Sequence, residues 1–555
     1  MTVLRKALTL GLYGAAAVAT LTPVSFAVAQ TTGAIPATVA APALEGVTVV
    51  GSRRANASAT DTPVPIDFIP LSKTSEQGGQ FDLSQSLQYL SPSFNSTRQT
   101  GADGADLIDS AALRGLGSDQ TLVLVNGKRR HTTALVNLFG ARNRGNTGTD
   151  LNAIPTLAID NVQILRDGAA AQYGSDAIAG VMNISLKKSK GCEAILGYSQ
   201  YSVGDGKNYL PSAYCGFGIG ENGVLGITAE YSDRGRSNRA EPDNPRIIGD
   251  TQSKNATLYL NGELPTSGTG KLYFTLGAQN RDASSAAFAR GGVGSDDIPT
   301  RNSAAMYPGG FVPFINGDIT DRTAIVGHRW QLGEWTADLS QTYGSNEMRY
   351  RISNTINASI ANKDLLAGGA GRSASVFQAG GFLFSQATTN LDFSKFFEGF
   401  LGGSNVAFGA EYRRENYQIY AGEAGSYIDA DGVGFGGNAG SQGFPGFQPA
   451  DATNRNRDTM AVYRYDPETK TLGDMLASHP RYDMGADAQG TRVAGVSIDP
   501  ETNKLLGYRV EADKPEIVWT DESRAKTQQM LDAALPGMIN TFRRTKGSKL
   551  LVSSF

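Results

Sequence analysis

The chain has 555 residues, among them 67 glycines, 3 tryptophans and 2 cysteines. This length allows two or more domains, and the glycine content is typical of turn-rich β structure rather than of a helical bundle. The formal net charge of -3 excludes a strongly basic surface. Nucleic acid is therefore not expected as a partner, because neutralisation of phosphate charge supplies most of the affinity for it.

The first 29 residues have the pattern of a secretory signal peptide. Two basic residues at positions 5 and 6 precede an apolar run from 7 to 21, and Ala-Val-Ala at 27–29 predicts cleavage after Ala29. A membrane anchor is the alternative, but the run is short for a span. No later stretch of about 20 apolar residues occurs, so a mature chain in a membrane is expected to cross it as β-strands.

A tether rich in Ala, Pro and Thr follows at 31–44 and is expected to be flexible. After the tether comes a short β-prone run bounded by glycine, and by itself this run predicts a first edge strand. An extended segment on a flexible tether is also suited to add a strand to the sheet edge of a partner protein. The run consists of Glu45, Gly46, Val47, Thr48, Val49 and Val50.

A small mixed α/β domain is predicted next. We expect an edge strand interrupted by proline at 63–69 and a helix over 81–90, where apolar residues recur at helical spacing. A glycine corner at 113–117 then precedes TLVLVNGKR at 121–129, a β-rich run with an Asn-Gly turn. The stretch 159–186, IDNVQILRDGAAAQYGSDAIAGVMNISL, predicts two short strands separated by turns and one helical turn.

Together, these two motifs resemble the plug domain of TonB-dependent outer-membrane receptors. The family pattern runs roughly R-G-x-G, T-L-V-L-x-N-G-x-R and then V-x-I-L-R-G-P-x-S-A-x-Y-G-x-x-A-I-x-G-V-x-N-I. Here Arg166-Asp167-Gly168 replaces the common Arg-Gly-Pro. The positions that carry the resemblance are Arg114, Gly115, Gly117, Asn126, Gly127, Arg129, Arg166, Tyr173, Gly174, Gly180 and Asn183.

The resemblance implies a function and a set of partners. The run Glu45–Val50 would be the TonB box, bound by a TonB-type energy-transducing protein. The protein would lie in the outer membrane of a Gram-negative bacterium, in contact with its lipid. It would take up a scarce external ligand, which could be an iron chelate, cobalamin, an oligosaccharide or a peptide. No enzymatic activity, cofactor or metal is expected.

From Cys192 onward, apolar and polar residues alternate, as in 225–231, 271–278 and 406–413. This alternation is typical of a transmembrane barrel, with one face toward lipid and the other toward the lumen, although soluble sandwiches alternate too. Long polar loops are expected at 282–321, 354–380 and 421–458. About ten strands are predicted, at roughly 193–202, 209–219, 224–233, 254–264, 271–281, 322–332, 335–350, 381–394, 404–419 and near Met460.

Cys192 and Cys215 would meet if the first two strands pair as a hairpin, in an export compartment that permits disulfides. Two unpaired thiols are the alternative, and two cysteines without nearby histidines make no metal site. The arginines at 114, 129, 130 and 166 are interpreted as structural. We expect them to pair with carboxylates of the barrel wall, for instance Glu230, Glu411 or Glu415, and ligand binding is the alternative.

Beyond about residue 462 the charge density rises and the alternation stops. Short strands are expected near 496–498 and 505–510, and a helix over 523–534. Segments 477–483, 507–515 and 531–537 resemble part of the β-propeller of prolyl-oligopeptidase-family serine peptidases. No G-x-S-x-G occurs in the chain, so the nucleophile elbow of such a peptidase is missing.

We therefore predict a mainly-β chain in which a small α/β plug precedes an incomplete antiparallel barrel. A short β-rich segment of different origin follows the barrel, and we attribute the junction between them to a gene fusion or an assembly error. About ten strands are too few to surround a plug, and an open sheet edge in lipid leaves backbone groups unpaired, so no transport is expected from the chain as written. A fragment of a secreted serine peptidase without its catalytic domain is the alternative function. The predicted parts are a signal peptide (1–29), a tether with the TonB-box-like run (30–56), the plug (57–190), the partial barrel (191–463) and the peptidase-like segment (464–555).

Overall fold

The structure is a computed structural model that describes residues 66–554 with gaps. The predicted signal peptide, tether and TonB-box-like run therefore lie outside the described residues. The gaps are 72–80, 97, 109, 138–140, 143, 167, 294–301, 399–402, 433–438, 450–460, 467–470, 479–495, 500, 501, 503, 512–514, 539 and 545–549.

The first part of the described chain, here called the N-terminal domain, contains a five-stranded sheet with the order β1-β4-β5-β2-β3. Strands β2 and β5 are parallel, and the other neighbours are antiparallel. The predicted helix is α2 (Leu83–Leu90), and the carboxylate of Asp82 caps it by accepting from the backbone N–H of Gln85. The strands are β1 (Ile66–Pro70), β2 (Thr121–Val125), β3 (Lys128–Arg129), β4 (Ile159–Leu165) and β5 (Gly180–Leu186).

The N-terminal domain buries an apolar core on both faces of its sheet. Strand β2 is a continuous apolar run, and β4 and β5 are buried at nearly every position, although both also contain polar residues. The helical turns are η2 (Ala105–Leu107), η3 (Ser118–Gln120), η4 (Leu151–Ala153), η5 (Thr156–Ala158), α3 (Ala170–Tyr173) and η6 (Ser175–Ala177). The core includes Leu83, Leu87, Val123, Val162, Ile164, Met182 and Ile184.

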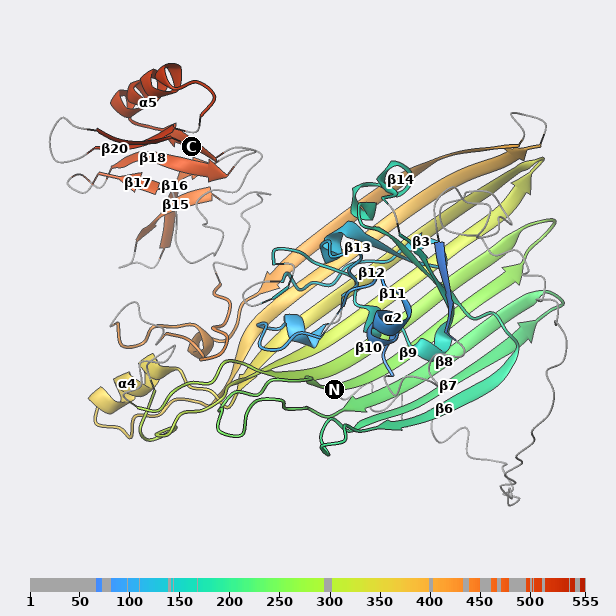
Figure 1. Ribbon diagram of the computed structural model, residues 1–555, viewed down its shortest axis with the longest axis horizontal. Coiled ribbons are helices and arrows are strands. Elements are labelled where there is room, and N and C mark those ends of the chain that lie inside the picture. Colours follow the sequence, from blue (N-terminus) through green and yellow to red (C-terminus); the bar gives the residue numbers. More distant parts are fainter. Residues whose placement is uncertain are drawn as a thin grey trace. The chain divides into compact units, whose positions relative to one another are not determined.

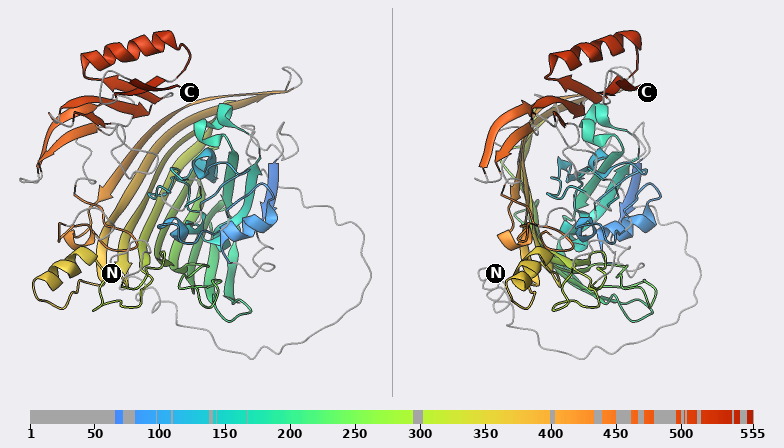
Figure 2. Two further views of the ribbon diagram at one scale, coloured as in Figure 1. Left: turned by 60° about the vertical axis from the view of Figure 1, so that its left-hand side comes forward. Right: turned by 90° about the vertical axis from the view of Figure 1, so that its left-hand side faces the viewer.

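The second part, here called the large sheet, consists of nine antiparallel strands in sequence order from β6 to β14. Figure 1 shows its strands side by side, and both views of Figure 2 show a curved sheet with the N-terminal domain against one face. The strands are β6 (Gly191–Ser199), β7 (Asn208–Ile219), β8 (Gly223–Arg234), β9 (Gln252–Pro265), β10 (Lys271–Ala286), β11 (Phe314–Leu332), β12 (Trp335–Ser353), β13 (Val376–Phe397) and β14 (Ser404–Tyr420). The predicted mainly-β fold with an antiparallel sheet is confirmed.

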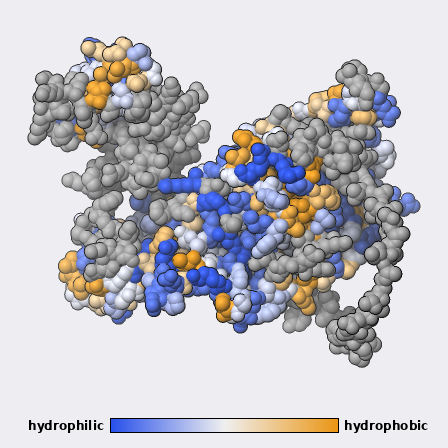
Figure 3. All heavy atoms as spheres, in the orientation of Figure 1, coloured by the Kyte–Doolittle hydropathy of each residue, from blue (hydrophilic) through white to orange (hydrophobic). Residues whose placement is uncertain are grey.

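The two faces of the large sheet differ in polarity, as the alternation in the sequence predicts. The inward face, which contacts the N-terminal domain, buries polar side chains such as Thr275, Gln279, Thr342 and Asn346. Hydrophilic residues are prominent on the middle of the face turned to the viewer in Figure 3. The outward face carries apolar side chains that are 39% to 55% exposed: Leu258, Leu276, Val326, Leu339 and Phe408.

Several predicted boundaries are wrong. Strands β10 and β11 continue to Ala286 and from Phe314, so the predicted loop 282–321 is shorter, because small polar residues such as Ser284 and Ser285 also pair in the sheet. The loop predicted at 354–380 contains the helix α4 (Ala358–Leu366). The tenth strand near Met460 begins instead at Ala461, as β15, and pairs outside the large sheet.

The last part of the chain forms separate small sheets. Strands β15 (Ala461–Asp466) and β16 (Thr471–Ser478) pair with each other. Two further sheets are formed by strands that precede and follow α5 (Glu522–Ala534) in the sequence. The bounds of α5 are close to those of the helix predicted at 523–534. The strands of these two sheets are β17 (Val496–Ile498), β18 (Leu505–Glu511), β19 (Pro515–Trp519), β20 (Asn540–Arg544) and β21 (Leu550–Ser554). No helix in the described ranges is both long and apolar enough to span a membrane.

Candidate functional site

The interface between the N-terminal domain and the inward face of the large sheet is the candidate functional site. It begins at the turn between β2 and β3, where Asn126 and Gly127 both have positive φ, as a two-residue hairpin of this kind requires. The Asn126 amide donates to Asn261 Oδ1 at 3.0 Å and to Thr275 Oγ1 at 3.1 Å. Its Oδ1 accepts from the backbone N–H of Leu186 at 3.0 Å. One motif residue thus joins β5 to strands β9 and β10.

Two of the four residues that follow this turn are basic side chains directed at wall carboxylates. Lys128 Nζ lies 3.0 Å from Asp338 Oδ1 on β12 and 3.7 Å from Asp392 Oδ2 on β13. Arg130 forms a buried ion pair with Asp321 on β11. Charged pairs of this kind, with little access to water, hold the domain in one register against the sheet.

Asp321 is the centre of a buried cluster. Besides Arg130, it faces His131 Nε2 at 3.0 Å and accepts from the Asn346 amide at 3.1 Å. Asn346 Oδ1 in turn accepts from the backbone N–H of Ala134 at 2.9 Å. Burial and the neighbouring Arg130 charge hold the pKa of His131 below its ordinary value, so the ring is neutral at neutral pH.

A glycine of the large sheet makes room for the histidine. A Cβ at Gly344 on β12 would lie 2.0 Å from His131 Nδ1, so no larger residue fits without displacing the ring. Burial lowers the pKa of Arg130, but the charge of Asp321 outweighs burial and raises this pKa above its ordinary value. The guanidinium therefore stays charged. The cluster is therefore a fixed ion pair beside a neutral ring that fills a defined hole.

A second group of contacts lies nearer to β8 and β10. Arg281 pairs with Asp150 at 3.0 Å, with both side chains buried, and donates to the carbonyl of Leu107 at 3.0 Å. The hydroxyl of Thr156 donates to Glu230 Oε2 at 3.4 Å. These contacts join the turns of the N-terminal domain, rather than its sheet, to the wall.

The part of the interface around Tyr350 is more apolar than the cluster at Asp321. The loop 101–108 of the N-terminal domain packs against Tyr350 on β12, and a Cβ at Gly104 would lie 2.6 Å from the Tyr350 hydroxyl. The Tyr350 ring stacks on Phe444 with 4.6 Å between centroids. On this loop, burial and the nearby Asp106 carboxylate raise the pKa of Asp103 to about 6.

The predicted wall partners are wrong for Arg129 and Arg166, and the described contact of Arg114 also lies within the N-terminal domain. Arg114 donates to the carbonyl of Arg166 at 3.1 Å, and Arg166 pairs with Asp67 of the same domain at 3.2 Å. Arg129 pairs with Asp176 and donates to the carbonyl of Tyr173 at 3.2 Å. Of the four arginines, Arg130 is the one that forms an ion pair with a wall carboxylate within the described ranges, and that carboxylate is Asp321. In the described residues, Glu230, Glu411 and Glu415 form no ion pair with these arginines.

The remaining motif residues shape the N-terminal domain. The backbone N–H of Gly127 donates to Asn183 Oδ1 at 2.9 Å. Gly180 has φ +140°, and a Cβ there would lie 2.3 Å from the carbonyl oxygen of Leu165, so only glycine lets β5 approach β4. The corner Arg114-Gly115 and the turn at Gly174 also have positive φ, whereas Gly117 does not.

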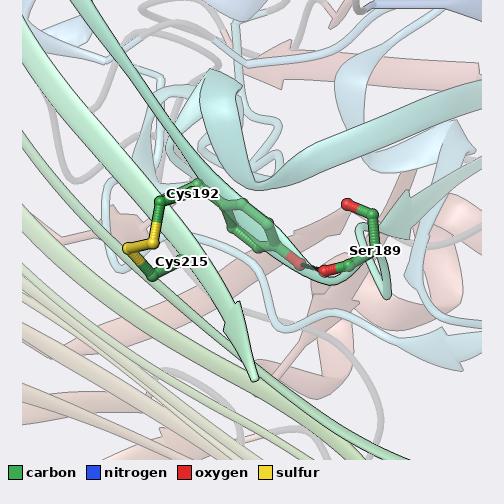
Figure 4. Close-up of a disulfide and its surroundings, with 4 residues drawn as sticks. Ser189, Cys192 and Cys215 are labelled. Carbon is green, nitrogen blue, oxygen red and sulfur yellow. Dashed lines mark hydrogen bonds between the residues drawn. A yellow bond between two sulfur atoms is a disulfide. The ribbon is translucent and has the colours of Figure 1, made fainter. Parts of the chain in front are cut away.

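Sequence reasoning missed Lys128, His131, Asp321 and Asp338 as interface residues. The basic run directly after the Asn-Gly turn was the available signal for the first two. The two aspartates sit at inward positions of β11 and β12, where alternation predicts polar residues but does not select a partner about 190 residues away. The two cysteines lie opposite each other on β6 and β7 and form a disulfide (Figure 4).

Comparisons with known proteins find a matching family model and several similar chains. Residues 58–181 match the family model described as TonB-dependent Receptor Plug Domain. The chain is 29% identical over 276 residues to the ferric enterobactin receptor of Pseudomonas aeruginosa, which covers 47% of this chain and 35% of that protein. It is 28% identical over 203 residues to the vitamin B12 transporter BtuB of Vibrio cholerae, which covers 35% of this chain and 29% of that protein.

A shorter sequence match and a solved structure are also similar to parts of the chain. The chain is 42% identical over 76 residues to a probable TonB-dependent siderophore receptor PirA of Acinetobacter baumannii, which covers 14% of this chain and 10% of that protein. The crystal structure of the siderophore receptor PirA from Acinetobacter baumannii aligns with a TM-score of 0.46 and 16% identity, over 64% of this chain and 48% of that one. The chain thus spans between 10% and 35% of the length of these curated relatives.

Proposed function

Because residues 58–181 match the plug domain of TonB-dependent receptors, we propose that the chain is a truncated part of a receptor that acts in active uptake at the outer membrane of a Gram-negative bacterium. The ligand is a scarce external compound, and the energy comes from a TonB-type protein. No covalent bond of the ligand changes in this activity. The relatives reported above are receptors and transporters rather than peptidases, so nothing favours the peptidase-fragment alternative.

One observation supports the proposal more than any other. The plug contacts the wall through polar and charged groups, namely Asn126, Lys128, Arg130, His131, Asp150 and Thr156. Water replaces such partners once the surfaces part, because a neutral hydrogen bond contributes only about 1 kcal/mol net to stability and one to a charged group only about 1.5–3 kcal/mol. A plug held in this way stays closed at rest and is able to separate from the wall under an applied force.

The outward face supports a membrane location. Its apolar side chains alternate with inward polar ones, which is the arrangement of a barrel strand in lipid. Aromatic rings gather at the end with short turns, where Trp335 lies 5.5 Å from Phe408 and 6.2 Å from Phe397 between ring centroids. Aromatic residues are enriched at this depth, where hydrocarbon meets the polar headgroups.

We propose the following sequence of events. An external ligand binds to the loops and to the plug loop at 101–108, which is already packed against Tyr350 of the wall. A TonB-type protein then binds the run Glu45–Val50 and pulls, and the polar contacts at Asp321 and Asp338 break. Among the possible ligands, we propose a ferric siderophore or cobalamin first, because the relatives named above carry these ligands in their names.

Binding of the partner is the direct test. The purified chain in detergent, with or without residues 45–50, would be exposed to the immobilised periplasmic domain of a TonB-type protein. We expect the intact chain to bind and the deleted chain to lose at least tenfold in affinity. A matched control deletes six residues of the tether, 35–40. Equal binding by the chain lacking 45–50 would contradict the proposal.

A further inference from the structure

The loop 101–108 of the N-terminal domain is folded around one of its own carboxylates. Asp106 Oδ2 accepts from the backbone N–H of Gly101 at 3.0 Å and from that of Ala102 at 3.4 Å. Gly101 and Asp103 have positive φ, as is typical of tight turns. Two acidic side chains, Asp103 and Asp106, therefore share one short turn.

This turn is docked against the wall. Asp106 is 8% exposed, and Asp103 is half-buried. Leu107 fills a gap at β11, where a Cβ at Gly317 would lie 2.8 Å from Leu107 Cδ1. The wall strands that cover the turn, β10 to β12, each have a neighbour on both sides, so this burial does not depend on where the large sheet ends.

Little positive charge compensates the two carboxylates. In the part of the chain that the structure describes, neither forms an ion pair, and Arg290, between β10 and β11, is the cation that acts on Asp103. Arg281 contacts the loop but already pairs with Asp150. The other polar or charged groups at the turn are Ser285 on β10, Tyr350 on β12 and Arg246 between β8 and β9.

The docked position therefore favours neutral carboxyl groups. Burial raises the pKa of Asp103 and that of Asp106, and for Asp103 the neighbouring Asp106 charge adds to the effect. Separation of the turn from the wall returns both groups to water, where the charged form is favoured.

We propose that residues 101–108 form a proton-operated latch on the wall. While Asp103 holds its proton, the loop stays docked against Tyr350. When Asp103 gives that proton to water, the buried charge and its repulsion by Asp106 loosen the loop and uncover the Tyr350 ring. The inference goes beyond uptake and rests on the contacts of this loop, so it needs neither a pulling force nor a closed sheet.

Hydrogen exchange on the full chain in detergent tests the latch. Protection of the amides of Ala102, Ala105 and Leu107 would be measured at about pH 4 and about pH 7.5, each corrected for the intrinsic exchange rate at that pH. The pKa of Asp103 is about 6 in the docked loop and has an ordinary value of 3.8, so raising the pH favours the undocked loop. We expect the protection to fall by roughly 60-fold across this range.

Three variants sharpen the test. Asp103→Asn, which is neutral at both pH values and tolerates the positive φ, should keep the protection of the wild type in acid. Asp106→Asn keeps an amide oxygen for the two backbone N–H groups of the loop but removes the second charge, so the fall should be smaller than in wild type. Asp119→Asn, at an exposed position of the same domain, is the matched control and should behave as wild type.

The segment next to Tyr350 supplies an internal reference. The amide of Gln442 donates to the carbonyl of Ile356 at 3.1 Å, and that of Phe447 donates to the carbonyl of Ala379 at 3.0 Å. These bonds lie outside the loop, so the protection of both amides should be the same at the two pH values.

Three outcomes would overturn the inference. One is constant protection of the loop in wild type at the two pH values, and another is a fall in Asp103→Asn as large as in wild type. The third is an equal fall at Gln442 and Phe447, because the whole region would then open and the loop would be no latch. The wild-type profile and Asp106→Asn keep the test decisive if Asp103→Asn does not fold. No readout involves a ligand or a TonB-type protein.

Discussion

The core of the N-terminal domain and its interface with the large sheet differ in what they bury. The core is aliphatic, with Val162, Ile164 and Met182 almost fully excluded from solvent. The interface buries a carboxylate, a guanidinium and an imidazole around Asp321. An apolar core is lost only when the domain unfolds, whereas charged contacts are replaced by water once the surfaces part. The difference means that the domain is able to leave the wall as a folded unit.

Removing the central carboxylate should have the largest effect. Asp321→Ala leaves Arg130 buried without its partner, which costs about 3–5 kcal/mol. We expect the N-terminal domain to dissociate from the large sheet after cleavage at a protease site placed at 188–190, whereas the wild-type domain stays bound. Asp318→Ala, an exposed position on the same strand, is the control. Retention of the domain by both variants would show that the charged contacts at Asp321 do not hold it against the wall.

A core substitution should act on the other region. Ile164→Ala removes a fully buried side chain and is expected to destabilise the N-terminal domain by about 2–5 kcal/mol. Chemical unfolding followed by circular dichroism in detergent measures the change. Leu339→Ala, at an exposed position on the outward face, is expected to change the unfolding midpoint little. If both variants unfold at the wild-type denaturant concentration, the aliphatic core is not what stabilises the domain.

The hole for His131 offers a smaller, steric test. Gly344→Ala places a methyl group within 2.0 Å of the imidazole and should weaken the interface by about 1–3 kcal/mol. His131→Ala in the same chain removes the clash and should recover part of the loss. Retention of the cleaved domain is again the readout, with Ser345→Ala, on the opposite face of the same strand, as control. If the two substitutions lower retention of the domain additively instead of compensating, the His131 ring does not fill the space beside Gly344.

Acid should have the smallest effect, at the outer loop. Asp103 has a pKa near 6 in the folded protein and an ordinary value of 3.8. The folded state therefore binds this proton more tightly, so the contribution of Asp103 to stability is greatest below about pH 4 and is lost as pH rises to about 6. Asp103→Asn should flatten the pH dependence of the unfolding midpoint between pH 4 and 7. Asparagine also tolerates the positive φ at this position. If the unfolding midpoint depends equally on pH in wild type and Asp103→Asn, the raised pKa does not belong to Asp103.

The sequence predicted the parts of the fold that depend on local pattern. The turns at Asn126-Gly127 and Gly174, the helix at 83–90 and most strand centres follow from turn chemistry and from periods of 2 and 3.6. The ion pairs of the interface do not follow, because Asp321 meets Arg130 only when two distant segments pack in one register. Strand ends such as Ala286 were missed because small polar residues at inward positions resemble loop sequence. The resemblance of the last segment to a peptidase propeller stays a prediction.

Native-state hydrogen exchange on wild type and Asp321→Ala measures whether the domain leaves the wall as a folded unit. The measurement compares amides of 128–134, which lie at the interface, with amides of β4 and β5 in the core. We predict that the substitution lowers protection at 128–134 by at least a hundredfold and leaves β4 and β5 within a few-fold of wild type. Equal losses in both regions would show that the domain does not separate from the wall as a folded unit, and would contradict the account.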